Sequence, residues 1–64
     1  MSDVEELKAE IKKWSNAAMK AKLDLHDLSE ELPVNWETIP QIAERTYEAY
    51  KTLEAKRAAL KALT

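Results

Sequence analysis

The stretch Leu32-Pro-Val-Asn-Trp-Glu-Thr-Ile-Pro40 decides the fold, because here the sequence must leave one helix and start another. Proline disfavours helical geometry in the residue before it and lacks a backbone N–H, so a helix cannot continue past Leu32. The second proline suits the first turn of a new helix, which Asn35 or Thr38 can cap. The sequence therefore predicts a turn at residues 33–38 between two helices.

A first helix is predicted before this turn, over residues 3–32. Ser2 and Glu5 have the spacing of a capping box, which indicates a helix start at Asp3. Apolar and small residues then recur every three or four positions through four heptads, which is typical of a left-handed coiled-coil stripe. The stripe consists of Val4, Leu7, Ile11, Trp14, Ala18, Ala21, Leu25, Leu28 and Leu32. Its two flanking edges differ, since one carries Lys8, Ser15, Lys22 and Ser29 and the other carries Glu10, Ala17, Asp24 and Glu31.

A second helix is predicted after the turn, over residues 39–63. Its stripe consists of Ile39, Ile42, Thr46, Ala49, Leu53, Lys56, Leu60 and Leu63, widened on one side by Ala43, Tyr50 and Arg57. A charged residue inside an apolar stripe opposes packing, so Lys56 leaves the register of the last two turns open. Because the connection is short, the two helices are expected to lie antiparallel, in one all-α hairpin domain that spans residues 1–64.

The chain is too small to build a large core by itself. It has 64 residues and no cysteine, so no disulfide can compensate for the small apolar area that one hairpin buries. A two-helix hairpin hides only part of each apolar stripe, and two hairpins are therefore expected to pair as a homodimeric four-helix bundle. The predicted dimer core consists of Leu7, Ile11, Trp14, Leu25, Leu28, Ile42, Leu53 and Leu60.

The distribution of charge suggests how two hairpins pair. The turn end is acidic through Asp24, Asp27, Glu30, Glu31 and Glu37, whereas the far end of the second helix is basic through Lys56, Arg57 and Lys61. Pairing the hairpins head to tail sets one acidic end beside one basic end, although each surface ion pair contributes only about 0–1 kcal/mol. The sequence thus favours an antiparallel dimer.

The composition argues against several functional classes. One histidine, no cysteine and serines confined to a cap and helix surfaces leave no arrangement for a Ser-His-Asp triad, so we expect a non-enzymatic protein without catalytic residues or cofactors. No segment has the roughly 20 apolar residues that span a bilayer, and residues 1–15 lack a signal-peptide core; a cytoplasmic protein is expected. A net charge of −2 gives no general attraction to nucleic acid or anionic lipid.

His26 and Glu30 are a candidate for weak binding of a divalent metal. Their spacing of four residues brings the two side chains together on one helix face, with Asp27 adjacent. Symmetry-related residues of a dimer or Asp27 would have to complete the coordination. A solvated histidine in an ordinary i,i+4 pair is the alternative, and the single nitrogen ligand favours it.

Four apolar side chains outside the stripes form the candidate partner surface. Met19 and Leu23 lie opposite the stripe on the first helix, where they are either a docking patch or ordinary exposed residues. Trp36, in the turn, either covers the open end of the bundle or anchors a partner. Tyr47, on an outward face of the second helix, is the fourth candidate.

The turn also carries a family resemblance. The motif Leu32-Pro33-x-Asn35-Trp36-x-x-Ile39-Pro40, followed by Ala43, Thr46, Tyr47, Ala49 and Tyr50, resembles the Rop-like small proteins of unknown function associated with nitrogen fixation. The similarity extends over essentially the whole chain. It implies a homodimeric four-helix bundle and a cytoplasmic accessory protein with a nitrogen-fixation protein as partner, aiding nitrogenase assembly, cofactor supply or electron delivery. It supplies no catalytic or binding residues.

An RNA-binding dimer is the alternative that the comparison with Rop raises. Such a function needs basic side chains gathered on one helix face, and Lys8, Lys12, Lys13 and Lys20 provide part of such a cluster. Glu5, Glu6 and Glu10 are interspersed with them, and a dimer would carry a net charge of about −4. The charges therefore disfavour nucleic acid as a partner.

Overall fold

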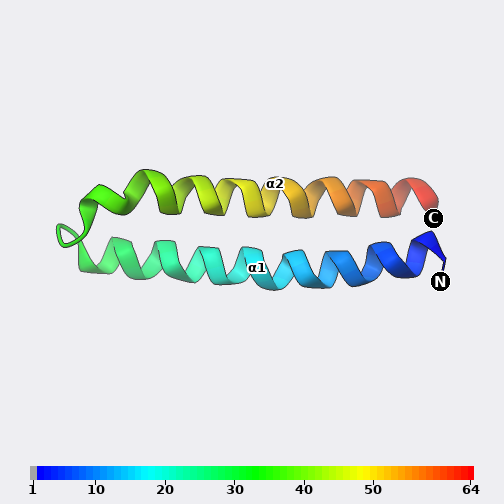
Figure 1. Cartoon of the computed structure of the whole chain (residues 1–64), viewed down its shortest axis with the longest axis horizontal. Coiled ribbons are helices and arrows are strands. Elements are labelled where there is room, and N and C mark those ends of the chain that lie inside the picture. The colour runs from blue at the N-terminus through cyan, green and yellow to red at the C-terminus, as the bar shows by residue number, and fades with distance from the viewer. Residues whose placement is uncertain (1) are drawn as a thin grey trace.

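The computed structural model describes residues 2–64, which form an antiparallel helical hairpin (Figure 1). Helix α1 spans Asp3–Glu31, the 3-10 turn η1 spans Trp36–Thr38, and helix α2 spans Ile39–Leu63. The hairpin is a rod of 47 × 14 × 13 Å, and no strand occurs within residues 2–64. The predicted all-α hairpin is confirmed.

Helix α1 begins as the capping box predicts. The backbone N–H of Glu5 donates to Ser2 Oγ at 3.2 Å, which satisfies one of the free donors of the first turn. Asp3, Glu5 and Glu6 place negative charge at the positive end of the helix dipole. At the other end, the N–H of Leu32 still donates to the carbonyl of Leu28, and the helix stops before the proline.

The turn is held by its backbone. Asn35 adopts the left-handed conformation with φ of 62°, which reverses the chain in the absence of glycine. The Leu32–Pro33 peptide bond is cis. Thr38 occupies the N-cap position of α2, as predicted, and Asn35 that of η1, but neither side chain makes a cap hydrogen bond. Thr38 Oγ1 instead donates to the carbonyl of Asn35 at 2.7 Å, because the intervening 3-10 turn puts that carbonyl within its reach.

The two helices pack mainly through small residues. Ala18, Ala21, Ala49 and Leu53 form the buried cluster, and Ile11 and Trp14 pack against it. Alanine side chains let two helix axes approach closely but remove little apolar surface from water. Of the residues predicted for the dimer core, Leu28 and Leu53 are buried within the hairpin, while Leu7, Ile11, Trp14, Leu25, Ile42 and Leu60 remain half-buried.

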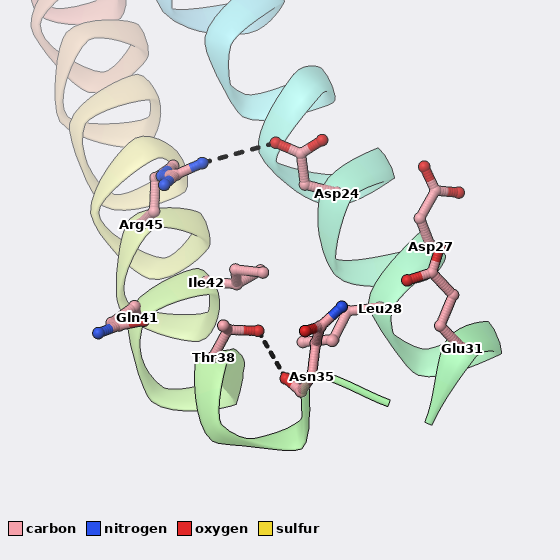
Figure 2. Close-up of a pocket in the computed structure, with 9 residues that line it drawn as sticks. All are labelled: Asp24, Asp27, Leu28, Glu31, Asn35, Thr38, Gln41, Ile42 and Arg45. Atoms are coloured by element: carbon pink, nitrogen blue, oxygen red, sulfur yellow. Dashed lines mark hydrogen bonds and ion pairs between the residues drawn. The ribbon is translucent and has the colours of Figure 1, made fainter. Parts of the chain in front are cut away.

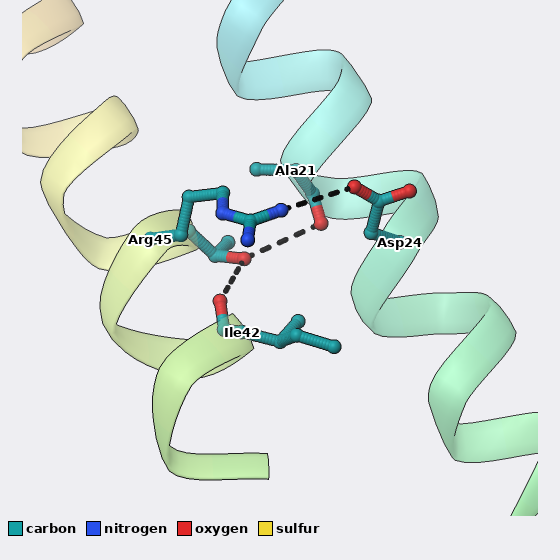
Figure 3. Close-up of polar contacts among 5 residues, drawn as sticks. Ala21, Asp24, Ile42 and Arg45 are labelled. Atoms are coloured by element: carbon teal, nitrogen blue, oxygen red, sulfur yellow. Dashed lines mark hydrogen bonds and ion pairs between the residues drawn. The ribbon is translucent and has the colours of Figure 1, made fainter. Parts of the chain in front are cut away.

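A polar contact crosses the same interface. The hydroxyl of Thr46 lies 2.8 Å from the carbonyl oxygen of Ile42 in its own helix and 3.3 Å from that of Ala21 in α1, and it can donate to either (Figure 3). Thr46 therefore occupies a stripe position without leaving its hydroxyl unpaired. This contact fixes the level at which the two helices face each other.

Candidate interaction surfaces

One long side of the hairpin is hollowed and charged, and we call it the groove face. It follows the acidic edge of α1 and the adjoining edge of α2. Near the turn, a groove of about 360 Å³ is lined on the α1 side by Asp24, Asp27 and Glu31 and on the α2 side by Gln41 and Arg45 (Figure 2). Carboxylates, an amide and a guanidinium offer both hydrogen-bond acceptors and donors to a polar partner.

An ion pair joins the two helices within the groove face. Arg45 Nη1 lies 3.6 Å from Asp24 Oδ2, and both residues also line a second groove of about 300 Å³ nearer the middle of the rod (Figures 2 and 3). The floor of that groove is apolar, with Trp14, Ala21 and Ala49. Arg45 was not among the residues predicted from the sequence, although the acidic edge of α1 was a signal that favoured a basic partner on α2.

A second ion pair explains the charged residue inside the stripe of α2. Lys56 Nζ lies 2.8 Å from Glu10 Oε2, and the Lys56 side chain is only 29% exposed. Its aliphatic stem covers apolar surface while its ammonium group reaches the acidic edge of α1. The stripe therefore continues through Lys56, and Leu60 beyond it is half-buried.

The four predicted partner residues are all exposed but do not form one patch. Exposed fractions are 61% for Met19, 55% for Leu23, 61% for Trp36 and 63% for Tyr47. Met19 and Leu23 are neighbours one turn apart on α1. Trp36 lies in η1, and the eleven residues to Tyr47 correspond to about 16 Å along α2.

Trp36 and Tyr47 have different surroundings. Within one hairpin Trp36 does not cover the end near the turn, because its side chain is among the most exposed apolar groups. Its covering of the open end of a bundle stays a prediction. Tyr47 already has a partner in its own chain, since Lys51 Nζ lies 5.8 Å from the centre of its ring. Trp36 thus presents the larger free aromatic surface.

The candidate metal pair lies together on the surface of α1. His26 Nε2 is 3.5 Å from Glu30 Oε1, and both side chains are about two-thirds exposed. Within the described residues, 2–64, no three histidine or acidic side chains gather closely enough to hold an ion. One imidazole and one carboxylate make a weak site at most, and metal binding here stays a prediction.

Some of the charged residues that favour head-to-tail pairing already form ion pairs within one chain. Asp24 of the acidic end pairs with Arg45, and Lys56 of the basic end pairs with Glu10. Arg57 Nη1 lies 3.1 Å from Oε1 of Glu54, one turn earlier in α2. These pairs reduce the charge left for a second hairpin, so charge alone gives a weaker argument for orientation than the sequence suggested.

The lysines that could bind RNA do not form a purely basic surface. Lys8, Lys12, Lys13 and Lys20 are all exposed on α1, but Lys20 lines the second groove beside Asp24 and Glu48. Nearby carboxylates lower the positive potential that a phosphate backbone requires. Within residues 2–64, neither helix combines the length and hydropathy that crossing a bilayer requires.

Fold and surfaces together define a small coiled-coil helical hairpin. Residues 2–64 match the family model described as Rop-like. The chain therefore belongs to the Rop-like family.

Relatives extend over almost the whole chain. A UPF0437 protein of Azorhizobium caulinodans is 57% identical over 63 residues, covering 98% of this chain and 91% of its own length. A UPF0437 protein of Frankia alni, described as lying in the nifX-nifW intergenic region, is 50% identical over 40 residues, which are 62% of this chain and 49% of that protein. An NMR structure solved by the Northeast Structural Genomics Consortium is 47% identical with a TM-score of 0.90, covering 97% of this chain and 87% of that one.

Proposed function

We propose that this protein is a non-enzymatic, homodimeric interaction module that works beside the nitrogen-fixation machinery. Its partner would be a protein concerned with nitrogenase assembly, cofactor supply or electron delivery. The observation that carries the proposal is a hairpin with an incompletely covered core that also exposes Met19, Leu23 and Trp36. The gene position of the Frankia alni relative supports the process.

The incomplete core supports the dimer. Six of the residues predicted for the dimer core are only half-buried in one hairpin, and four-helix bundles bury such residues by adding two more helices. A second hairpin completes the core without any change in the first. The four exposed side chains named as the partner surface then remain available, because Met19 and Leu23 lie on the side of α1 turned away from α2.

The grooves support binding over catalysis. Their linings combine carboxylates, one guanidinium and apolar floors, and among the described residues they include no histidine, serine or tyrosine. A docking surface needs apolar anchors with a polar rim, and these linings combine apolar with charged side chains. A cytoplasmic protein is the setting in which such a surface would act.

Affinity capture from nitrogen-fixing cells tests the proposal. Wild-type protein should recover a nitrogenase, maturation or electron-transfer protein, and Leu23→Lys and Trp36→Ala should each reduce that recovery. The matched control is Ala55→Lys, which places the same charge on an exposed position of α2 away from these residues. Recovery of none of these protein classes by the wild type would contradict the proposed role.

A further inference from the structure

The turn end of the rod combines exposed apolar side chains with an excess of negative charge. Four of the nine large apolar side chains exposed within residues 2–64 lie in the stretch 32–39, which forms this end (Figure 1). We propose that the turn end docks a positively charged amphipathic helix of a partner protein, an inference that rests on the proposed function and names the chemistry of its partner.

Val34 and Trp36 form the apolar part of the turn itself. Their exposed fractions are 60% and 61%. Leu32 and Ile39 beside them belong to the two stripes, so a second hairpin can cover them. Val34 and Trp36 belong to neither stripe, and the pairing of stripes therefore gives no reason for their apolar character. Apolar side chains gathered in one exposed turn indicate contact with another molecule.

The same end is strongly acidic. Residues 27–40 contain four carboxylates, Asp27, Glu30, Glu31 and Glu37, and no lysine or arginine. The whole chain has a net charge of −2, so this segment of charge −4 leaves the other residues with a net charge of +2. Within residues 2–64, only Glu30 of the four has an ionic partner, His26 at 3.5 Å. Lysines or arginines on a partner would complement this charge.

Two of these carboxylates stand at the unfavourable end of α1. The C-terminal end of a helix dipole is negative, and basic residues are the ones that stabilise it. Helix α1 instead ends with Glu30 and Glu31 and has no basic residue in its last turn, although its first turn follows the same rule with three acidic residues. Departures from such local rules are expected at functional sites. A cation supplied by a partner would relieve the repulsion.

The groove next to the turn can receive a basic side chain of the docked helix. Leu28 and Ile42 give its lining of about 360 Å³ an apolar part, and Asp27 and Glu31 add carboxylates one turn apart on α1 (Figure 2). Arg45, the one basic residue of this lining, is already engaged in its ion pair with α1. The aliphatic stem of a lysine or arginine can therefore lie along the apolar part while its charged group reaches the two carboxylates.

The order of these residues fits a helix as the partner. Along the chain, Glu30 and Glu31 precede the apolar pair Val34 and Trp36, and Glu37 follows it. An amphipathic helix presents an apolar stripe bordered by charged side chains, which matches an apolar centre with carboxylates on both sides. Anionic lipid and nucleic acid carry the same sign of charge as this end and would be repelled.

A synthetic peptide tests the apolar part of the docking site. The probe is a labelled amphipathic helix of about 18 residues with leucines on one face and lysines on the other, and fluorescence anisotropy measures its binding to the full chain. Trp36→Ala should weaken binding by at least about tenfold, because an aromatic anchor is lost. Leu63→Ala is the matched control: it removes a side chain of similar exposure, 56%, at the other end of the rod and should leave the affinity within about twofold.

The charged part is tested with the same peptide. Glu31→Gln combined with Glu37→Gln should weaken binding by about fivefold or more. Glu5→Gln combined with Glu54→Gln makes the same change of charge at exposed positions away from the turn and should have little effect. Raising the salt from about 50 to about 500 mM should weaken binding to the wild type more than to the Glu31 and Glu37 variant. A peptide with glutamate in place of every lysine should not bind.

Four outcomes would overturn the docking site. The first two are no binding of the lysine peptide to the wild type, and equal binding by the wild type and both turn-end variants. The third is shielding of Trp36 from acrylamide in the free Trp14→Phe chain, which has Trp36 as its single indole, because a second hairpin would then cover this end. The fourth is binding to phosphatidylcholine vesicles in place of the peptide, which would identify a lipid surface.

The proposed function is judged separately by capture from nitrogen-fixing cells. If Leu23→Lys abolishes the capture of a nitrogen-fixation protein but the turn-end variants capture it as the wild type does, the proposed role stands and the docking site at the turn is overturned. If the peptide binds at the turn end but no nitrogen-fixation protein is captured, the docking site stands and the proposed role is contradicted.

Discussion

Lys56 meets two opposed requirements. Its position belongs to the apolar stripe of α2, yet its ammonium group pairs with Glu10 at 2.8 Å on the acidic edge of α1. The pair is partly exposed, so water and salt screen it and its contribution to stability is about 0–1 kcal/mol. Its main value is directional, because it fixes which residue of α1 lies opposite the last turns of α2.

Replacing this lysine by leucine should stabilise the hairpin. Lys56→Leu loses a weak ion pair but buries apolar atoms at a position where the helices touch, so the free energy of unfolding should rise by about 1 kcal/mol. Glu10 stays hydrated, since its side chain is 41% exposed. Urea unfolding followed by circular dichroism measures the change. The control, Lys56→Gln, should lower stability by less than about 1 kcal/mol, and a large loss in both variants would contradict this account.

Asn35 is a second residue whose type is restricted, in this case by its backbone conformation. Its φ of 62° lies in the left-handed region, which costs a residue with a Cβ roughly 1 kcal/mol unless its side chain is short and polar. Asn35→Ala should therefore lower the free energy of unfolding by about 1 kcal/mol. Asn35→Gly should leave it within about 0.5 kcal/mol of wild type, since glycine adopts this conformation freely but loses more entropy when the chain folds. Equal effects of both substitutions in thermal unfolding would exclude backbone conformation as the cause.

The helices differ from ordinary coiled-coil partners in the layer where they meet. Ala18, Ala21 and Ala49 are nearly inaccessible to water and stand where leucine is common. Because alanine leaves little space between helix axes, this layer sets their separation and tolerates no added volume.

Enlarging this layer should be costly. Ala21→Leu forces three extra carbon atoms into a closed contact, so the free energy of unfolding should fall by about 1–3 kcal/mol. Ala58→Leu makes the same substitution on an exposed position of α2 and should change stability by less than about 0.5 kcal/mol. Chemical denaturation of the two variants beside wild type measures the contrast. A neutral Ala21→Leu would mean that the helices separate more easily than the packing indicates.

The limits of prediction from sequence follow from what each pattern encodes. Heptad spacing fixes which residues face a neighbouring helix, so both helices and their stripes were predictable. The pairing of Arg45 with Asp24 was not, because it depends on the relative level of two helices, which single-chain periodicity leaves free. The covering role of Trp36 concerns the end of a bundle and stays a prediction, because one hairpin leaves its side chain 61% exposed. The partner surface is harder still, since an exposed side chain looks the same whether or not it binds.

The whole molecule is a thin rod with a small core. Its extents of 47 × 14 × 13 Å leave no residue far from solvent, and five residues qualify as buried core among those described. So little buried area gives one hairpin marginal stability, in keeping with the scaling of surface with size. Folding and association are therefore expected to occur as one transition.

Coupled folding and association should make thermal stability depend on concentration. If only the dimer is folded, mass action stabilises it as the protein concentration rises, so Tm should increase by several degrees over a hundredfold range. Circular dichroism melts at low and high concentration in the same buffer give the measurement. Leu25→Lys, which puts a charge at a half-buried position of the α1 stripe, should lower Tm more than Lys20→Glu, which changes an exposed residue of the groove face. A Tm that does not change with concentration would mean that the hairpin folds alone.

The outer ends of the two helices lie together, since Asp3 of α1 and Leu63 of α2 line the same groove at the end away from the turn (Figure 1). The chain path is therefore almost a closed ring. A short linker joining these ends, with new termini opened at the exposed Val34, would exchange the order of the helices and leave every contact between them unchanged. The stability of this fold comes from the contacts between the two helices, and it does not depend on which helix comes first in the sequence.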